Sequence, residues 1–151
     1  MDSVIENSMV IAGISTRIDD PTNAAQQIET LWHKFWQENI SSKVINKFNG
    51  TIYTVYHNYQ GDFTKPYTTT IGYRINKIED APALLSIVVI PAQHYKVFTA
   101  HGRLPESIVN IWKKIWQANL HRTYTFDLEI YDERAQNPQD AIVDIYIAVT
   151  E

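Results

Sequence analysis

The sequence predicts an α+β fold made of two strand–helix–strand–strand units, and three observations lead to this prediction. Segments rich in β-branched and aromatic residues alternate with two segments whose apolar residues recur at three- and four-residue spacing. The second amphipathic segment repeats the first at a fixed distance along the chain. The strand-like segments that follow each of them also resemble each other, which favours a duplicated unit.

The first unit begins with a strand predicted over 9–18 (MVIAGISTRI), which is β-branched and partly alternating. Asp20 can cap the helix that follows. This helix is predicted to run to about Asn39, with an apolar stripe made of Ile28, Leu31, Trp32 and Phe35. Two further strands are predicted over 51–59 and 67–75.

The second unit follows an additional strand predicted over 84–90, and extended chain continues over 94–100. Pro105 opens the second helix, whose apolar face consists of Ile108, Ile111, Trp112, Ile115 and Trp116. Two last strands are predicted over 124–132 and 141–149. The order of elements in the first unit is thereby repeated.

The repeat is clearest in the helices, where 28–36 (IETLWHKFW) aligns with 108–116 (IVNIWKKIW), 80 positions further along the chain. Both tryptophans and one lysine keep their spacing, which a shared helical period alone does not require. The strands agree more loosely. TIYTVYHN resembles YTFDLEIYD, which places Tyr56 over Tyr131, and TTTIGYRI resembles AIVDIYIAV.

The length and composition fit one domain, 1–151, with pseudo-repeats at about 8–76 and 84–150. A hydrophobic share of 44% and a charged share of 20% are typical of a soluble globular protein. The formal net charge is -4 and the thirteen basic residues are scattered, so we expect no direct contact with nucleic acid. We also expect no helix-turn-helix reader ahead of the first predicted strand.

The chain has no cysteine, which excludes disulfides and thiolate metal sites and fits a cytoplasmic location. No apolar run reaches the length of a membrane span, and the N-terminus does not read as a secretory signal, so we expect no membrane association. The five histidines form no HExxH pair and no close cluster with acids, so no metal is predicted. No nucleophile elbow or phosphate-binding glycine loop is present, and we expect neither a catalytic motif nor a cofactor.

Candidate functional residues come from the alternation of the last two predicted strands. In 124–132, one face carries Asp127, Glu129 and Tyr131, and the other carries Phe126, Leu128 and Ile130. In 141–149, Asp144 and Tyr146 lie opposite three apolar residues. If the two strands are antiparallel neighbours, we expect this acid and this tyrosine to join the polar face of Glu129.

A carboxylate among aromatic side chains suits an organic cation, because the acid pairs with the charge while the rings give cation–π and stacking contacts. The same arrangement suits proton transfer, since burial and a bound cation shift a carboxyl pKa in opposite directions. A surface glutamate on a solvated sheet face remains the alternative.

The tryptophans divide into two pairs. Trp32 and Trp112 fall within the apolar stripes, and we expect them to pack in the core. Trp36 and Trp116 lie one helical turn further on and are the candidate walls of a ligand groove. Among the tyrosines of the first repeat, only Tyr56 is assigned to the pocket, because the strand repeat places it over Tyr131.

The run VVIPAQHYKVFTAHG (88–102), the helix IVNIWKKIWQ and the strands YTFDLEIYD and AIVDIYIAV closely resemble the GyrI-like, AraC-type effector-binding domains. The resemblance is closest to free-standing integron cassette members that bind cationic drugs, and LWHKFW and NGTIYTVYHNY extend it to nearly the whole chain. It implies two units related by a pseudo-twofold axis, an antiparallel sheet, and two main helices flanking a ligand groove.

The resemblance also implies a set of ligand-binding residues. The pocket glutamate of the family matches Glu129, and the pocket residue two positions further on matches Tyr131. An acid, a hydrophobe and a tyrosine in the last strand match Asp144, Ile145 and Tyr146. Positions on the helices are less well fixed in the family, and Trp36 and Trp116 are carried over on that basis. The implied function is the binding of a cationic, amphipathic small molecule with Glu129 as counter-ion.

Two other functions of the same fold stay open. One is a small-molecule hydrolase in which Glu129 acts as general base, assisted by the hydroxyl of Tyr131 or Tyr146. The other is a protein-interaction module resembling the gyrase-inhibitor member of the family. For the binding protein, we expect a monomer or weak dimer, with a separate DNA-binding regulator as a candidate partner.

Overall fold

The computed structural model describes residues 2–150 and contains an antiparallel sheet of eight strands in the order β1-β6-β8-β7-β3-β4-β2-β5. The strands are β1 (Asp2–Glu6), β2 (Met9–Ile18), β3 (Lys47–His57), β4 (Tyr67–Ile75), β5 (Ser86–Ile90), β6 (Gln93–Gly102), β7 (Phe126–Tyr131) and β8 (Ala141–Ala148). The helices are α1 (Ala24–Gln37), α2 (Ile40–Lys43) and α3 (Glu106–Gln117). Short 3-10 turns are η1 (Pro21–Asn23), η2 (Ile78–Asp80) and η3 (Glu133–Ala135).

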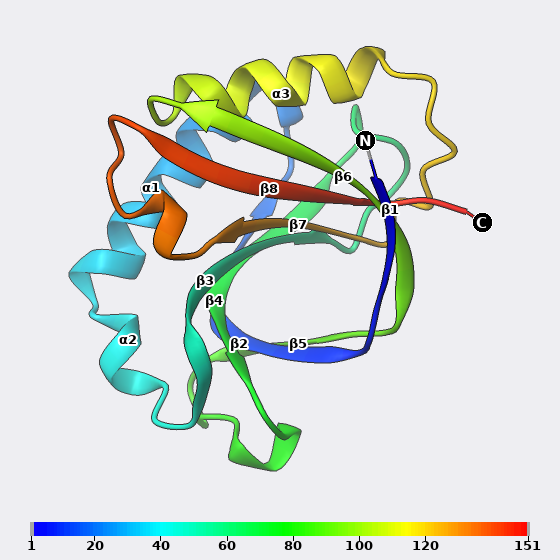
Figure 1. Ribbon diagram of the computed structural model, residues 1–151. Helices are drawn as coiled ribbons and strands as arrows, with labels where there is room; N and C mark the ends of the chain where they lie inside the picture. Colours follow the sequence, from blue (N-terminus) through cyan, green and yellow to red (C-terminus); the bar gives the residue numbers. More distant parts are fainter. Residues whose placement is uncertain (1, 151) are drawn as a thin grey trace.

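The sheet curls strongly, and the helices lie on its outer side (Figure 1). One apolar cluster fills the inside of the curl and includes Ile11, Tyr53, Val55, Tyr95 and Leu128. On the outer side, α1 packs on β2 and β4 through Leu31 and Phe35. The second long helix, α3, packs on β6 and β8 through Ile108 and Ile115. The outer face of the central strands β3 and β7 therefore lies between the two helices.

The duplication predicted from the sequence is visible in the strand order. Reading outward from the central pair, one half of the sheet is β7, β8 and β6, and the other half is β3, β4 and β2. The two remaining strands cross over, because β1 precedes the first unit but pairs with β6, and β5 precedes the second unit but pairs with β2. The outer edge of the second unit is thus formed by β1, which precedes the first unit in the chain. The outer edge of the first unit is formed by β5, which precedes the second unit.

The close approach of β2 and β4 depends on a pair of glycines. Gly13 and Gly72 are direct cross-strand partners. A Cβ on Gly13 would lie 2.0 Å from the carbonyl oxygen of Ile71, and one on Gly72 would lie 2.2 Å from that of Ala12. A side chain at either position would therefore force the two strands apart.

The predicted ends of the first helix differ slightly from the observed ones. Asp20 acts as a cap, but it caps η1, where its carboxylate accepts a hydrogen bond from the backbone N–H of Thr22 at 3.1 Å. The helix α1 ends at Gln37 rather than near Asn39, because Asn39 takes a left-handed conformation with φ of 49°. A short helix, α2, follows that residue and was not expected.

The edge strand β1 was not expected either. Its sequence, DSVIE, is short and begins and ends with an acidic residue, which is a weak strand signal. Its pairing with β6, from Asp2↔Val97 to Glu6↔Gln93, supplies the stabilisation. Strand formation here depends on a partner that lies about ninety residues away in the chain, which a local pattern does not reveal.

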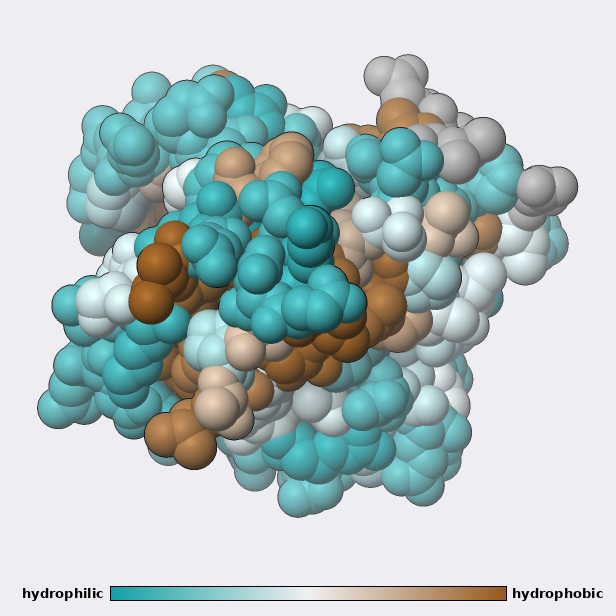
Figure 2. Space-filling view, turned by 90° about the horizontal axis from the view of Figure 1, so that it is seen from below, coloured by the Kyte–Doolittle hydropathy of each residue, from teal (hydrophilic) through white to brown (hydrophobic). Residues whose placement is uncertain are grey.

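The underside of the molecule exposes apolar side chains, which gather across the middle of the surface between hydrophilic areas (Figure 2). Among the large apolar residues outside the long helices, Ile45, Ile78 and Leu84 are strongly exposed, and Leu84 is 97% exposed. Within residues 2–150, no helix has both the length and the apolar character needed to cross a membrane.

Candidate functional site

Glu129 lies at the centre of the outer sheet face, on β7. Its direct cross-strand partners are Thr54 on β3 and Ile145 on β8. Ile145 belongs to the apolar cluster beneath α3, and paired residues point to the same side of a sheet, so Glu129 faces the helices. Only 2% of its surface is exposed. The alternative of a solvated surface glutamate is therefore wrong.

Three uncharged donors hold the Glu129 carboxylate. The hydroxyl of Tyr56 and the indole Nε1–H of Trp112 both donate to Oε2, each at 2.7 Å. The hydroxyl of Tyr131 donates to Oε1, also at 2.7 Å. An ionised carboxylate can accept about four hydrogen bonds, so these donors fix its position and satisfy most of its acceptor capacity.

Aromatic rings from the two long helices and from the sheet surround this carboxylate. The ring of Trp112 on α3 lies edge-on to Tyr56 with 5.3 Å between centroids. The ring of Trp32 on α1 lies edge-on to Tyr131 at 5.1 Å. A fifth ring, that of Tyr67, contacts Tyr56 at 6.0 Å. The acid is thus enclosed by side chains whose faces and edges are suited to both apolar and cationic groups.

The environment sets the charge states of these groups. Burial raises the pKa of Glu129 above its ordinary value of 4.5, and the hydrogen bonds from Tyr131, Tyr56 and Trp112 oppose that rise. Burial and the neighbouring Glu129 charge raise the pKa of both tyrosines well above 10.0. Both hydroxyls therefore remain protonated donors at neutral pH.

Asp127 lies two residues before Glu129 on the same face and has a different set of partners. It is completely buried, and its Oδ2 accepts from Nη2 of Arg122 at 2.8 Å and from the hydroxyl of Tyr59 at 2.5 Å. Its Oδ1 accepts from the backbone N–H of Ala148 at 2.8 Å. Burial raises the Asp127 pKa while the Arg122 charge lowers it. Asp127 therefore has a cationic partner inside the protein, whereas the three donors to Glu129 are neutral.

The expectation that Asp144 and Tyr146 share the face of Glu129 is wrong. The strands β7 and β8 are antiparallel neighbours as supposed, but Tyr146 pairs with Leu128 and Asp144 pairs with Ile130. Both side chains consequently point to the opposite face of the sheet. Alternation fixes which residues of one strand share a face, but a shift of one residue in the pairing exchanges the faces of two neighbouring strands.

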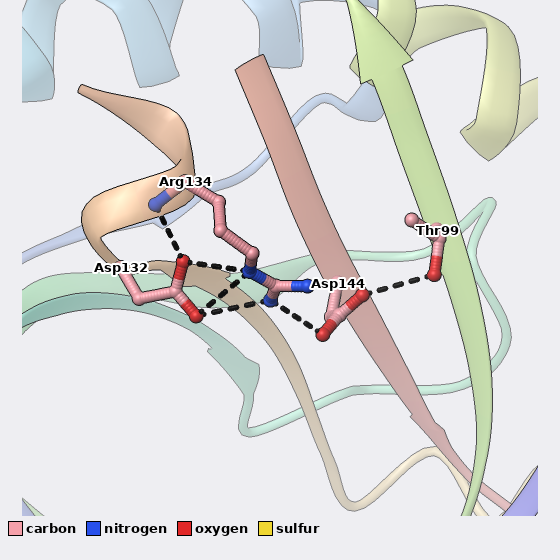
Figure 3. Close-up of polar contacts among 4 residues, drawn as sticks. All are labelled: Thr99, Asp132, Arg134 and Asp144. Atoms are coloured by element: carbon pink, nitrogen blue, oxygen red, sulfur yellow. Dashed lines mark hydrogen bonds and ion pairs between the residues drawn. The ribbon is translucent and has the colours of Figure 1, made fainter. Parts of the chain in front are cut away.

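These two residues have structural partners on the inner side. Tyr146 packs on Tyr95 with 5.5 Å between ring centroids. The carboxylate of Asp144 accepts from Nη2 of Arg134 at 2.7 Å and from the hydroxyl of Thr99 at 2.9 Å (Figure 3). Arg134 belongs to η3 and also donates to Asp132. Its bond to Asp144 joins η3 to β8.

The tryptophans occupy the helix faces that the sequence predicts. Trp32 and Trp112 pack against the cores under α1 and α3 as expected, but Trp112 in addition bonds Glu129, a contact that the apolar spacing did not reveal. Trp36 and Trp116 are 60% and 46% exposed and lie beside Trp32 and Trp112 at 6.1 and 6.3 Å. The one usable signal for Trp112 was the general need of a half-buried indole N–H for an acceptor.

Two further observations bear on the chemistry of the site. Of the predicted residues, Tyr56 and Tyr131 are brought into contact with Glu129, and Trp36 and Trp116 lie one layer outside. Throughout residues 2–150, no group of three or more histidine, aspartate or glutamate side chains is arranged to hold a metal ion.

Comparison with known proteins gives one family and several relatives. The family described as integron-associated effector binding protein matches residues 4–149. A Bacillus subtilis (strain 168) protein, YobU, named as a candidate transcriptional regulator, is 31% identical over 144 residues, which cover 91% of this chain and 90% of that protein.

Solved structures share the fold at lower identity. SAV2435 bound to tetraphenylphosphonium superposes with a TM-score of 0.79 at 19% identity, covering 99% of this chain and 94% of the other. The integron cassette protein VCH_CASS2 from Vibrio cholerae superposes with a TM-score of 0.77 at 21% identity, covering 99% and 95% of the two chains.

Proposed function

Because the chain belongs to the family of integron-associated effector binding proteins, we propose that it binds lipophilic organic cations between α1 and α3, with Glu129 as the counter-ion. The ligand contacts in this proposal are the rings of Tyr56, Tyr131 and Trp112 and the outer rings of Trp36 and Trp116. Asp144 and Tyr146 have no part in it, since they lie on the other face of the sheet.

The observation that carries the proposal is a buried acid whose three partners are all neutral. Removing a carboxylate from water is costly, and neutral hydrogen bonds recover only part of that cost. For Asp127, two residues away, the ion pair with Arg122 offsets the cost of burying the charge. Glu129 has only neutral partners within the described residues, so a cation that binds beside it offsets the remaining cost of burying its charge.

The surrounding rings define the kind of cation. Tyr56, Tyr131 and Trp112 already donate to the carboxylate, so a ligand gains little from N–H donors of its own. A cation with delocalised or alkylated charge loses less hydration on burial than an ammonium group, and it packs well against aromatic faces. Because Glu129 is 2% exposed, such a ligand enters only when some of these rings rotate, a common response to binding.

Related proteins support the same class of ligand. SAV2435, which shares this fold, is bound to tetraphenylphosphonium, a lipophilic cation without a hydrogen-bond donor. The name of the Bacillus relative links it to transcription. With a net charge of -4, this chain is poorly suited to DNA, so we assign it the ligand-binding step and leave DNA contact to a separate protein.

The experiment compares tetraphenylphosphonium with triphenylphosphine oxide, a neutral compound with similar aryl groups. We expect the cation to raise the melting temperature and quench tryptophan fluorescence, and the neutral compound to do so much more weakly. Glu129→Gln keeps the shape of the side chain and should weaken the cation by about tenfold to a hundredfold, the usual range for losing a charged hydrogen-bonding partner.

The affinity of the neutral compound should be nearly the same in Glu129→Gln as in the wild-type protein. Asp144→Asn provides the matched control, because it removes an acid from the opposite face of the same sheet. Equal losses for both compounds, or no loss for either, would contradict the proposal.

A further inference from the structure

Arg122, the internal partner of Asp127, is incompletely hydrogen-bonded. Its Nη2 donates to Asp127, but Nε and Nη1 are buried and have no acceptor anywhere in residues 2–150. The side chain as a whole is 5% exposed. Buried donors are nearly always paired, because an unpaired donor gives up its hydration for nothing. Two unpaired nitrogens on one buried guanidinium are therefore available to an acceptor that a bound ligand supplies.

The ring of Tyr124 covers this guanidinium. Its ring centroid lies 4.3 Å from Cζ of Arg122, and Tyr59 lies edge-on to the same ring at 5.6 Å. The backbone of Tyr124 has φ of 53°, in the left-handed region that is unfavourable for a residue with a Cβ.

The Arg122 pair lies beside the site of Glu129. Asp127 and Glu129 are two residues apart on one face of β7, a separation of about 7 Å at the usual rise of a strand. The ring of Tyr67 lies between the tyrosine partners of these two acids. Its centroid is 6.0 Å from that of Tyr56, which donates to Glu129, and 5.6 Å from that of Tyr59, which donates to Asp127. A ligand of ordinary drug size that reaches Glu129 is therefore long enough to reach Arg122 as well.

The charge of the Arg122–Asp127 pair decides which kind of acceptor the two unpaired nitrogens of Arg122 can bind. Asp127 already neutralises Arg122 and is completely buried, so an anionic ligand group would place two negative charges against one positive charge away from water. A neutral acceptor avoids this cost. We propose that Arg122 forms a second subsite, which binds a carbonyl or ester oxygen of an organic cation whose charge lies at Glu129. This inference rests on the proposed function, because it places both groups of one ligand on the same sheet face.

The test uses two cations of the same charge and length. Benzoylcholine carries an ester, and (4-phenylbutyl)trimethylammonium replaces that ester by two methylene groups. The double variant Arg122→Met with Asp127→Asn removes the donors without leaving an unpaired buried charge. The same pair of substitutions at the exposed ion pair, Arg134→Met with Asp132→Asn, is the matched control.

We expect the preference for the ester, expressed as the ratio of the two dissociation constants, to fall about tenfold in the double variant, as for loss of a charge-assisted hydrogen bond. The control should keep the ratio of the wild-type protein. An unchanged ratio in a folded double variant would overturn the inference.

A measurement on the wild-type protein covers the case in which the double variant does not fold. The Nε–H resonance of Arg122 should shift when the ester binds and stay in place when the alkyl analogue binds. The same response to both compounds would overturn the inference equally.

A neutral ester, 3,3-dimethylbutyl benzoate, separates this inference from the proposed function. If it binds as tightly as benzoylcholine and still depends on Arg122, the role of Glu129 is wrong and the second subsite stands. If the two cations depend on Glu129 but their ratio ignores Arg122, the second subsite is wrong and the proposed function stands.

Discussion

The two halves of the molecule frame the buried carboxylate in nearly the same way. The helix of the second half places Trp112 edge-on to Tyr56 of the first half, with 5.3 Å between centroids. The helix of the first half places Trp32 edge-on to Tyr131 of the second half, at 5.1 Å. The two tyrosines then donate to different oxygens of the same carboxylate, that of Glu129.

The halves differ at the position between the tyrosines. The strand alignment that places Tyr56 over Tyr131 also places Thr54 over Glu129, and these two residues are direct cross-strand partners. Thr54 is completely buried, and within the described residues its hydroxyl has no hydrogen-bond partner. Duplication thus accounts for a symmetric aromatic frame, and a single substitution between the halves accounts for its charge.

Exchanging the two central residues should have the largest effect. Glu129→Thr alone removes the charge and should weaken tetraphenylphosphonium by about tenfold to a hundredfold. Adding Thr54→Glu moves the acid to the equivalent position between the same tyrosines, and we expect it to recover most of the affinity. Fluorescence titration measures both. A double variant as weak as Glu129→Thr would mean that the two halves of the frame are not interchangeable.

Replacing each inner tryptophan by phenylalanine should have a smaller and unequal effect. Both changes keep a ring, but only Trp112→Phe removes a donor to Glu129. We expect Trp112→Phe to lower the free energy of unfolding by about 1.5–3 kcal/mol at neutral pH, the range for a hydrogen bond to a charged group. Trp32→Phe should cost less than about 1.5 kcal/mol, as for a tolerated change of apolar shape. Urea denaturation followed by circular dichroism gives both values, and equal losses would remove the distinction between the two halves.

Much of the fold was accessible from the sequence because its signals are local. The strands β2 and β4 were predicted with their observed bounds, and the helix repeat led to the duplicated architecture. The edge strand β1 and the short helix α2 were missed, since the first depends on a distant partner strand and the second on one left-handed residue, Asn39. These features follow from tertiary contacts rather than from periodicity.

The candidate site was predicted in part. Alternation placed Glu129 and Tyr131 on one face of β7, and the repeat added Tyr56. Asp144 and Tyr146 were misplaced because alternation within a strand does not fix its register with the next one. The partnership of Asp127 with Arg122 could not be predicted either, because Arg122 lies in an irregular segment before β7 and no periodic pattern indicates where its side chain points.

The pH dependence of cation binding tests the central claim most directly. Burial raises the pKa of Glu129 above 4.5, and a bound cation favours the ionised form, so protons and the cation compete for this carboxylate. In the wild-type protein, tetraphenylphosphonium affinity should be constant well above the raised pKa and should fall by about tenfold for each pH unit below it. In Glu129→Gln the affinity should be low and independent of pH over the same range. A wild-type affinity that does not change as Glu129 is protonated would contradict the account.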